Sequence, residues 1–156
     1  RFGKIGSQPQ LETVDIVPLV QSMVQYMKRR APDRVQFLVA QQEPDMPVMA
    51  SPTLINWVLE NLIKNALDAI EGKGSIHIDI AQSATQLFID VKDSGKGIAP
   101  ANISKVFSPG FTTKKRGWGL GLTLSKRIME QYHKGGLVVR QSEPGKGTTF
   151  RMTIPR

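Results

Sequence analysis

Two asparagines in one predicted helix, Asn61 and Asn65, have the chemical type and the spacing to hold a hard cation. Asparagine is a poor helix former, and a buried amide costs free energy unless it is hydrogen-bonded. At about 100° per residue, Asn61, Asn65 and Asp68 fall on the same side of the helix, at the edge of its apolar stripe. This polar row predicts the floor of a pocket, with amide oxygens available to a cation and its ligand.

A glycine-rich segment at residues 93–97 directly follows a predicted strand. Its glycines allow a sharp turn and a close approach of the backbone to a flat ligand. The carboxylate of Asp93, at the end of the strand, can accept a hydrogen bond from an exocyclic amine. A simple turn is the alternative, and for this segment alone it is favoured, because Asp, Ser and Gly are common turn residues.

A second glycine-rich segment, at residues 117–122, stands between three cationic residues at 114–116 and a predicted helix. Free N–H groups at a helix N-terminus attract anions, so this combination indicates phosphate binding rather than a flexible hinge. A third segment, at residues 145–149, is a hairpin turn when it is taken alone. The sequence contains no Walker, GxGxxG or protein-kinase motif, which argues against a P-loop enzyme, a Rossmann dehydrogenase and a protein-kinase fold.

The composition fits one globular domain of 156 residues. The absence of cysteine excludes disulfides and thiolate metal sites and is compatible with a reducing cytoplasm. There is no apolar run long enough to span a bilayer and no signal-peptide pattern. A formal net charge of +8 raises the alternative of nucleic-acid binding. The basic residues are scattered and not interleaved with aromatic residues, so a small anionic ligand is preferred and no nucleic-acid partner is expected.

Periodicity and turn residues predict the elements that position these segments. The expected helices are one capped by Asp15 and ending near residue 31, one from Ser51 to about residue 70, and one from about 119 to 135. The expected strands cover residues 35–39, 48–50, 76–80, 87–91, 137–141 and 149–154, with a long irregular stretch at 93–118. The order predicts a two-layer α/β (α+β) sandwich, in which about three helices cover one face of a mixed, largely antiparallel sheet.

In this order the motifs resemble the catalytic and ATP-binding domain of bacterial sensor histidine kinases, within the superfamily of gyrase, MutL and the large heat-shock chaperone. The resemblance is closest to the branch of nitrogen-regulation sensors, and it implies the Bergerat ATP-binding fold. The matching segments are residues 61–65 (N box), 93–97 (first glycine box), 106–114 (F box and start of the ATP lid), 117–122 (second glycine box) and 145–149 (third).

The resemblance implies a role for individual residues in binding ATP and Mg²⁺. Asn65 would be the metal ligand, Asn61 would line the same wall, and Asp93 would bind the adenine amino group. Catalysis would involve Asn61, Asn65 and Lys114. The other implied nucleotide contacts are Gly95, Gly97, Ile98, Phe107, Thr112, Thr113, Gly117, Gly119, Leu120, Gly121, Leu124 and Thr148, among which Ile98, Phe107 and Leu124 are candidates for the adenine walls.

The resemblance also implies a reaction, the transfer of the γ-phosphate of Mg-ATP to a histidine on another domain. Hydrolysing relatives carry a glutamate four residues before the metal asparagine, and this chain has Asn61 there, so attack by water is expected to be suppressed. An ATPase or an anti-sigma serine kinase is therefore a weaker alternative. A second alternative is a non-catalytic adaptor that senses nucleotides. It stays open because Trp118 stands where the family usually has a small or polar residue.

The phosphoacceptor histidine of the family lies in a preceding helical domain, and neither His77 nor His133 has that context. Residues 1–12 are therefore expected to be a linker from a dimerisation and phosphoacceptor domain, and residues 13–156 the catalytic domain. The implied partners are that domain and the receiver domain of a response regulator. The resemblance implies a monomeric fragment without membrane contact, a homodimeric full-length protein, and a location in the cytoplasm or in the cytoplasmic portion of a membrane-bound sensor.

Overall fold

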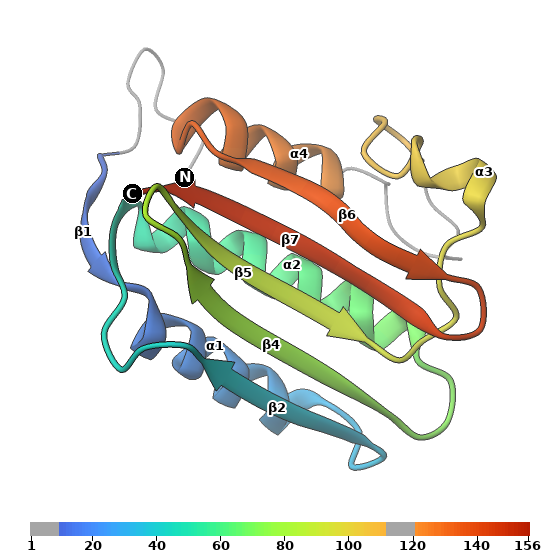
Figure 1. Cartoon of the computed structure of the whole chain (residues 1–156). Helices are drawn as coiled ribbons and strands as arrows, with labels where there is room; N and C mark the ends of the chain where they lie inside the picture. The colour runs from blue at the N-terminus through green and yellow to red at the C-terminus, as the bar shows by residue number, and fades with distance from the viewer. Residues whose placement is uncertain (1–9, 112–120) are drawn as a thin grey trace.

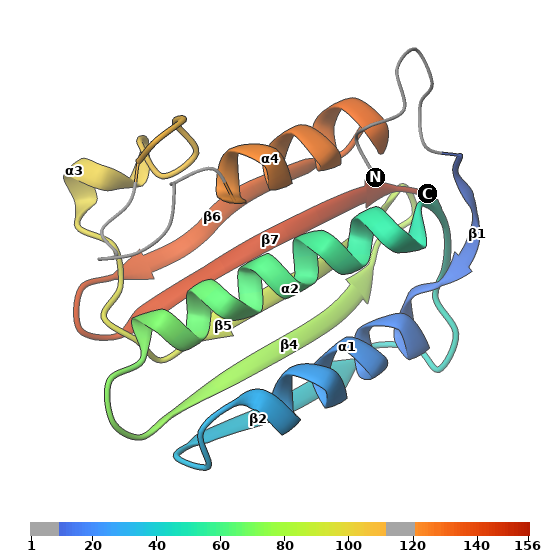
Figure 2. The ribbon, with the colours of Figure 1, turned by 180° about the vertical axis from the view of Figure 1, so that it is seen from behind.

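The computed structural model describes residues 10–111 and 121–156. Its core is one five-stranded sheet in the order β2-β4-β5-β7-β6, in which β2 and β4 are parallel and the other neighbours antiparallel. These strands are β2 (Val35–Gln41), β4 (Gly74–Gln82), β5 (Gln86–Asp93), β6 (Gly136–Glu143) and β7 (Gly147–Pro155). The helices α1 (Ile16–Arg30), α2 (Pro52–Ala69) and α4 (Gly121–Arg127) lie on one face of this sheet (Figures 1 and 2). The predicted two-layer α/β class is confirmed.

The two long helices begin where the sequence predicts. The Asp15 carboxylate caps α1 by accepting a hydrogen bond from the Val17 N–H at 3.2 Å. Ser51 caps α2 through its Oγ, which accepts from the Leu54 N–H at 3.3 Å, and Pro52 occupies the first turn. Both helices bury an apolar stripe against the sheet, where alternate residues of β4 and β5 complete the core.

Several elements differ from the predicted ones. A short strand β1 (Glu12–Asp15) pairs antiparallel with β3 (Pro47–Ala50) in a separate two-stranded sheet. A one-turn helix α3 (Pro100–Ile103) interrupts the long irregular stretch. The last helix is not uniform, because α4 continues as the π-helix η1 (Ile128–Tyr132). Within the described residues, no helix has the length and hydrophobicity needed to cross a bilayer.

His133 joins the end of η1 to the start of α2. Its side chain is buried, its Nδ1 donates to the Ile128 carbonyl at 3.0 Å, and its Nε2 accepts from the Ser51 N–H at 3.0 Å. Only a neutral imidazole makes both bonds. Burial lowers the pKa of His133 below its usual 6.5, an effect that the hydrogen bond to Ile128 partly offsets. These two hydrogen bonds give His133 a structural role, because they connect η1 to the N-terminus of α2.

We expect the stability of the fold to decrease as His133 is forced to take up a proton. The pKa of His133 in the folded protein lies below 6.5, so the unfolded chain binds the proton first as the pH falls. The contribution of His133 to the free energy of unfolding is therefore fully present above pH 6.5 and decreases below it. The slope contributed by one such group is at most about 1.4 kcal/mol per pH unit. Thermal unfolding between about pH 7.5 and about pH 5.5 measures it. His133→Gln should flatten the profile and His77→Gln, at an exposed position of β4, should not; equal slopes in all three proteins would contradict the assignment.

Candidate functional site

Asn61 is the point where α2 meets the start of α4. Its Nδ2 donates to Ser125 Oγ at 3.1 Å, and Ser125 is completely buried. A Cβ at Gly121 would lie 2.4 Å from Asn61 Oδ1, so only glycine fits while the amide keeps this position. Because His133 contacts Ser51 and Gly121 contacts Asn61, the two helices run antiparallel. The end of the second glycine box therefore rests against the N box.

The remaining polar residues of α2 occupy different environments. Asn65 is half-buried one turn beyond Asn61, and Asp68 is exposed. Glu60 forms an ion pair with Lys64 at 3.1 Å on the outer side of the helix. This pairing directs the Glu60 carboxylate toward Lys64, one turn further along α2. Ser125 was not predicted as a site residue, although a hydroxyl four residues after Gly121 is on the same helical face.

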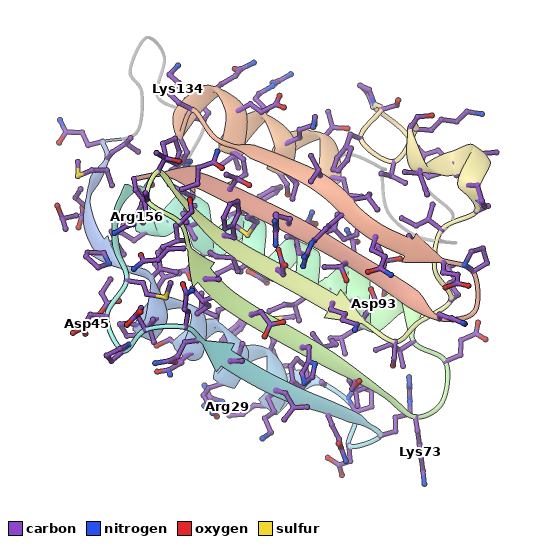
Figure 3. The ribbon with its side chains drawn as sticks, viewed as in Figure 1. Arg29, Asp45, Lys73, Asp93, Lys134 and Arg156 are labelled. Carbon is purple, nitrogen blue, oxygen red and sulfur yellow. The ribbon has the colours of Figure 1, made fainter. Side chains whose placement is uncertain are left out.

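Asp93 is the last residue of β5, the central strand of the sheet, and lies near the turn between β6 and β7 (Figure 3). It is 4% exposed, and its Oδ1 accepts a hydrogen bond from the Gly95 N–H at 2.8 Å. Burial raises the pKa of Asp93 above the usual 3.8, while the backbone N–H groups of Gly95 and Thr148 act in the opposite direction. A buried carboxylate held by backbone donors suits recognition of an amine, because its position is fixed before a ligand arrives.

The first and third glycine boxes lie against each other. Gly97 has φ +75°, and a Cβ there would lie 2.2 Å from the Glu143 carbonyl oxygen. The Gly145 N–H donates to the Lys96 carbonyl at 2.8 Å. On the other side, a Cβ at Gly95 would lie 2.4 Å from the Ala69 carbonyl oxygen. The loop after β5 is thus held between the end of α2 and the β6–β7 turn, and glycine is required for this packing.

The three candidate adenine-wall residues come from three separate segments, namely the loop after β5, the turn after α3, and α4. Ile98 and Phe107 pack against the core, and Leu124 is half-buried on α4. The Phe107 ring lies edge-on to Phe150, with ring centroids 6.2 Å apart, and its carbonyl accepts from Thr123 Oγ1 at 2.8 Å. Lys126 Nζ lies 4.6 Å from the centroid of the Phe107 ring. Thr123 and Lys126, which attach the F box to α4, were not predicted from the sequence.

Part of the predicted site lies outside the described residues. Those residues are Thr112, Thr113, Lys114, Gly117, Gly119 and Leu120. Trp118, the departure from the family pattern, also lies outside the described residues. The described residues contain no group of three or more His, Asp or Glu side chains able to hold a metal ion. A cation beside α2 would be bound by the amide oxygen of Asn65 together with phosphate and water oxygens. Mg²⁺ accepts this donor set, because it commonly keeps several waters and takes few protein ligands.

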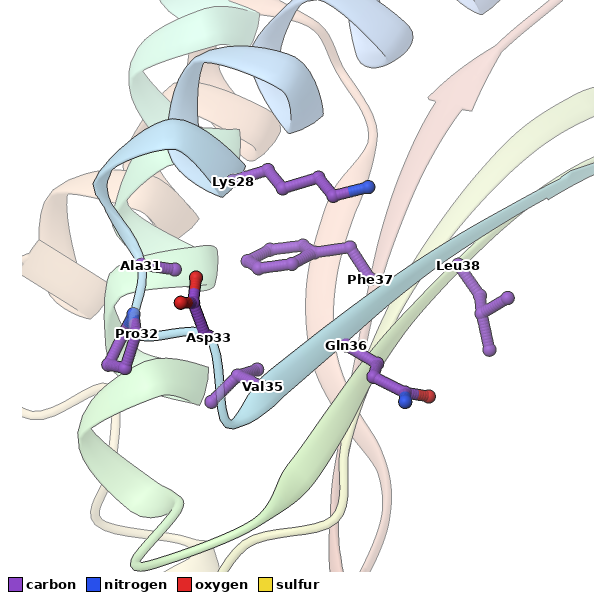
Figure 4. Close-up of a pocket in the computed structure, with 8 residues that line it drawn as sticks. All are labelled: Lys28, Ala31, Pro32, Asp33, Val35, Gln36, Phe37 and Leu38. Carbon is purple, nitrogen blue, oxygen red and sulfur yellow. The ribbon is translucent and has the colours of Figure 1, made fainter.

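A shallow hollow of about 360 Å³ lies elsewhere, where α1 ends and β2 begins (Figure 4). Its lining residues are Lys28, Ala31, Pro32, Asp33, Val35, Gln36, Phe37 and Leu38. None of them belongs to the predicted nucleotide site. The hollow is therefore separate from the residues that would bind ATP.

Comparison with known proteins places this geometry in a family. The profile of the histidine kinase-, DNA gyrase B- and HSP90-like ATPases matches residues 50–156. The sensor histidine kinase ZraS of Escherichia coli is 36% identical over 146 residues, which cover 93% of this chain and 31% of ZraS. AtoS, a signal transduction histidine-protein kinase of Escherichia coli, is 41% identical over 123 residues, covering 78% of this chain and 20% of AtoS. The chain thus spans a third or less of the length of these relatives.

Solved structures of histidine kinases share the fold. The catalytic domain of ThkA, in a nucleotide-free form, has a TM-score of 0.85 and 29% identity, covering 94% of this chain and 95% of that domain. Full-length ShkA in complex with AMPPNP has a TM-score of 0.86 and 25% identity, covering 98% of this chain and 32% of ShkA. The five boxes, the sheet order and the packing of α2 against α4 therefore have one explanation: this chain belongs to the histidine kinase-, DNA gyrase B- and HSP90-like ATPase family.

Proposed function

We propose that this chain is the ATP-binding catalytic domain of a sensor histidine kinase, and that it transfers the γ-phosphate of Mg-ATP to a histidine on a separate domain. The observation that carries the proposal is the contact of Asn61 with Gly121 and Ser125, which brings the N box and the start of α4 together. Asp93, which is buried at the end of β5, supplies the carboxylate that binds the base. The similarity to ZraS and AtoS supports this reading over other members of the family.

In the proposed site, each group has a positional role. Asn65 would bind Mg²⁺, Asp93 the adenine amino group, and Lys114 the γ-phosphate. Gly117, Gly119, Leu120 and Gly121 would offer backbone N–H groups to the phosphates, with Thr112 and Thr113 closing over them. Gly95 and Gly97 would admit the base between Ile98, Phe107 and Leu124, with Thr148 beside it.

The proposed reaction asks the protein mainly for positioning. In a loose phosphoryl transfer, the bond from the γ-phosphorus to the bridging oxygen breaks, ADP departs, and the bond to the imidazole nitrogen forms. The nucleophile is the imidazole itself, so no base that activates water is required. Asn61 stands at the position where hydrolysing relatives carry the glutamate, and the neighbouring Glu60 is paired with Lys64. Both features favour a kinase over an ATPase or an anti-sigma serine kinase.

The proposed partners follow from the relatives. ThkA has been solved in complex with the response regulator protein TrrA, and full-length ShkA in complex with AMPPNP. We propose a dimerisation and phosphoacceptor domain, preceding residue 13 through a linker, as the direct phosphate acceptor, and a receiver domain downstream. The chain alone would be monomeric, the full-length protein homodimeric, and the site cytoplasmic. Sedimentation of a tight dimer at micromolar concentration would contradict the monomer.

Calorimetric titration with ATP, in the presence and absence of Mg²⁺, tests the nucleotide site. We expect saturable binding that strengthens with Mg²⁺ and no binding of an oligonucleotide. Addition of a cognate phosphoacceptor domain and labelled ATP should then produce an acid-labile phosphohistidine on that domain. ATP binding without transfer would favour the nucleotide-sensing adaptor, and release of phosphate to water would favour the ATPase.

A further inference from the structure

One row of side chains crosses three strands at the base end of the proposed site. Asp93 on β5 is paired with Thr148 on β7, and Thr148 is paired with Ser142 on β6. Directly paired residues of antiparallel strands project from the same face of a sheet. Asp93 and Thr148 are both buried, and Ser142 Oγ lies 2.8 Å from Thr148 Oγ1. A base bound to Asp93 therefore has Thr148 as its neighbour and Ser142 behind Thr148.

Ser142 reaches this row because of a β-bulge. Val139 is paired with Phe150, but Gln141 is paired with Thr149, so Arg140 is an extra residue in β6. If β6 had no bulge and continued the register of Val139 with Phe150, Gln141 would lie opposite Thr148. The bulge thus exchanges a long amide for a short hydroxyl at this position.

The extra residue is held on the opposite face of the sheet. The Arg140 guanidinium donates to Asp90 Oδ2 at 2.8 Å, and Asp90 is also bound by Arg151 at 2.8 Å. Asp90 is buried, so its partners lie close against the strands. This ion-pair cluster on the open face fixes the position of the bulge, and hence the position of Ser142 on the helix-covered face.

The hydrogen bonds of Ser142 restrict the direction of its single proton. Its Oγ accepts from the Ile98 N–H at 2.8 Å, so the hydroxyl already uses one lone pair. Its proton is directed to Thr148 Oγ1 at 2.8 Å or to the Gly147 carbonyl at 3.3 Å. When Ser142 donates to Thr148, the proton of Thr148 is available to a ligand. When Ser142 donates to the Gly147 carbonyl instead, the Thr148 hydroxyl can donate its proton to Ser142 Oγ.

We propose that Ser142 is a specificity-determining positioning residue for adenine, which directs the Thr148 hydroxyl to donate to the base. Adenine presents an amino donor next to the ring nitrogen N1, an acceptor, whereas guanine and hypoxanthine present an acceptor oxygen next to an N1–H donor. Asp93 matches the amino group, and a donating Thr148 matches N1. The proposal rests on the proposed nucleotide-binding function and adds the residue that sets the polarity of the second contact.

Binding of ADP and of its 1-deaza analogue, which lacks the N1 acceptor, separates this role from a structural one. We expect Ser142→Ala to weaken ADP binding about three- to tenfold, the change produced by losing one neutral hydrogen bond. The same substitution should weaken the binding of 1-deaza-ADP much less, and only through the loss of the bond from the Ile98 N–H. Ser142→Thr keeps a hydroxyl and should restore the preference for ADP. Ser83→Ala, in the exposed turn between β4 and β5, is the matched control.

The outcomes distinguish this proposal from the proposed function. Equal weakening of ADP and 1-deaza-ADP by Ser142→Ala, or unchanged binding of both, would overturn the role of Ser142. If Ser142→Ala does not fold, the Ser142→Thr variant decides, because loss of its preference for ADP over 1-deaza-ADP would equally overturn the proposal. A wild-type chain that binds neither ADP nor ATP would instead overturn the nucleotide site itself.

Discussion

Asp93→Asn is expected to weaken ADP binding about tenfold to hundredfold, the change expected from losing a hydrogen bond to a charged acceptor. The substitution keeps the shape of the side chain and an oxygen that can accept from the Gly95 N–H, whose nitrogen lies 2.8 Å from Asp93 Oδ1. It replaces a carboxylate, which only accepts, by an amide whose NH₂ group opposes the adenine amine. Calorimetric titration of both proteins with ADP measures the change.

Inosine diphosphate provides the internal comparison for Asp93→Asn, because its six-position carries an acceptor oxygen. The variant should lose much less affinity for this nucleotide than for ADP. Asp79→Asn, on the exposed side of β4, is the matched control and should bind like wild type. Equal loss for both nucleotides would assign Asp93 to folding of the loop rather than to base recognition.

Asn65→Ala is expected to abolish the strengthening of ATP binding by Mg²⁺ while the fold survives. Asn65 is half-buried on α2, and an alanine there favours the helix, so the melting temperature should change little. In the presence of Mg²⁺ the affinity for ATP should fall about tenfold to hundredfold, as for other changes at a metal centre. In its absence, variant and wild type should bind alike.

Asn56→Ala controls for the loss of an asparagine from the same helix. On a helical wheel, residue 56 lies about 180° from residue 65, so its removal should leave the effect of Mg²⁺ intact. An Asn65→Ala protein with wild-type affinity in the presence of Mg²⁺ would refute the metal assignment. The phosphotransfer reaction should respond in parallel, because the proposed transfer uses Mg-ATP.

The local features of this fold could be predicted from the sequence because they depend on neighbouring residues. Asp15 and Ser51 cap the two long helices at the predicted starts, and the alternating residues of β4 and β5 form strands, as predicted. Likewise Gly97 adopts a positive φ that the glycine pattern favours. The missed strand β1 is only four residues long, and its partner β3 lies more than thirty residues away, so its pairing leaves little local signal.

The order of amino acids predicts the fold class, the family resemblance and the residue types of the site. Periodicity, capping and motif spacing depend only on the sequence of residues along the chain. Which of these residues touch depends on the folded arrangement instead. The contact of Asn61 with Ser125 depends on how α4 packs across α2. The pairing of Ser142 with Thr148 depends on one extra residue in β6. Side chains alternate between the faces of a strand, so a shift of one residue exchanges the side chain at the site, and such shifts are fixed by cross-strand contacts such as that of Arg140 with Asp90.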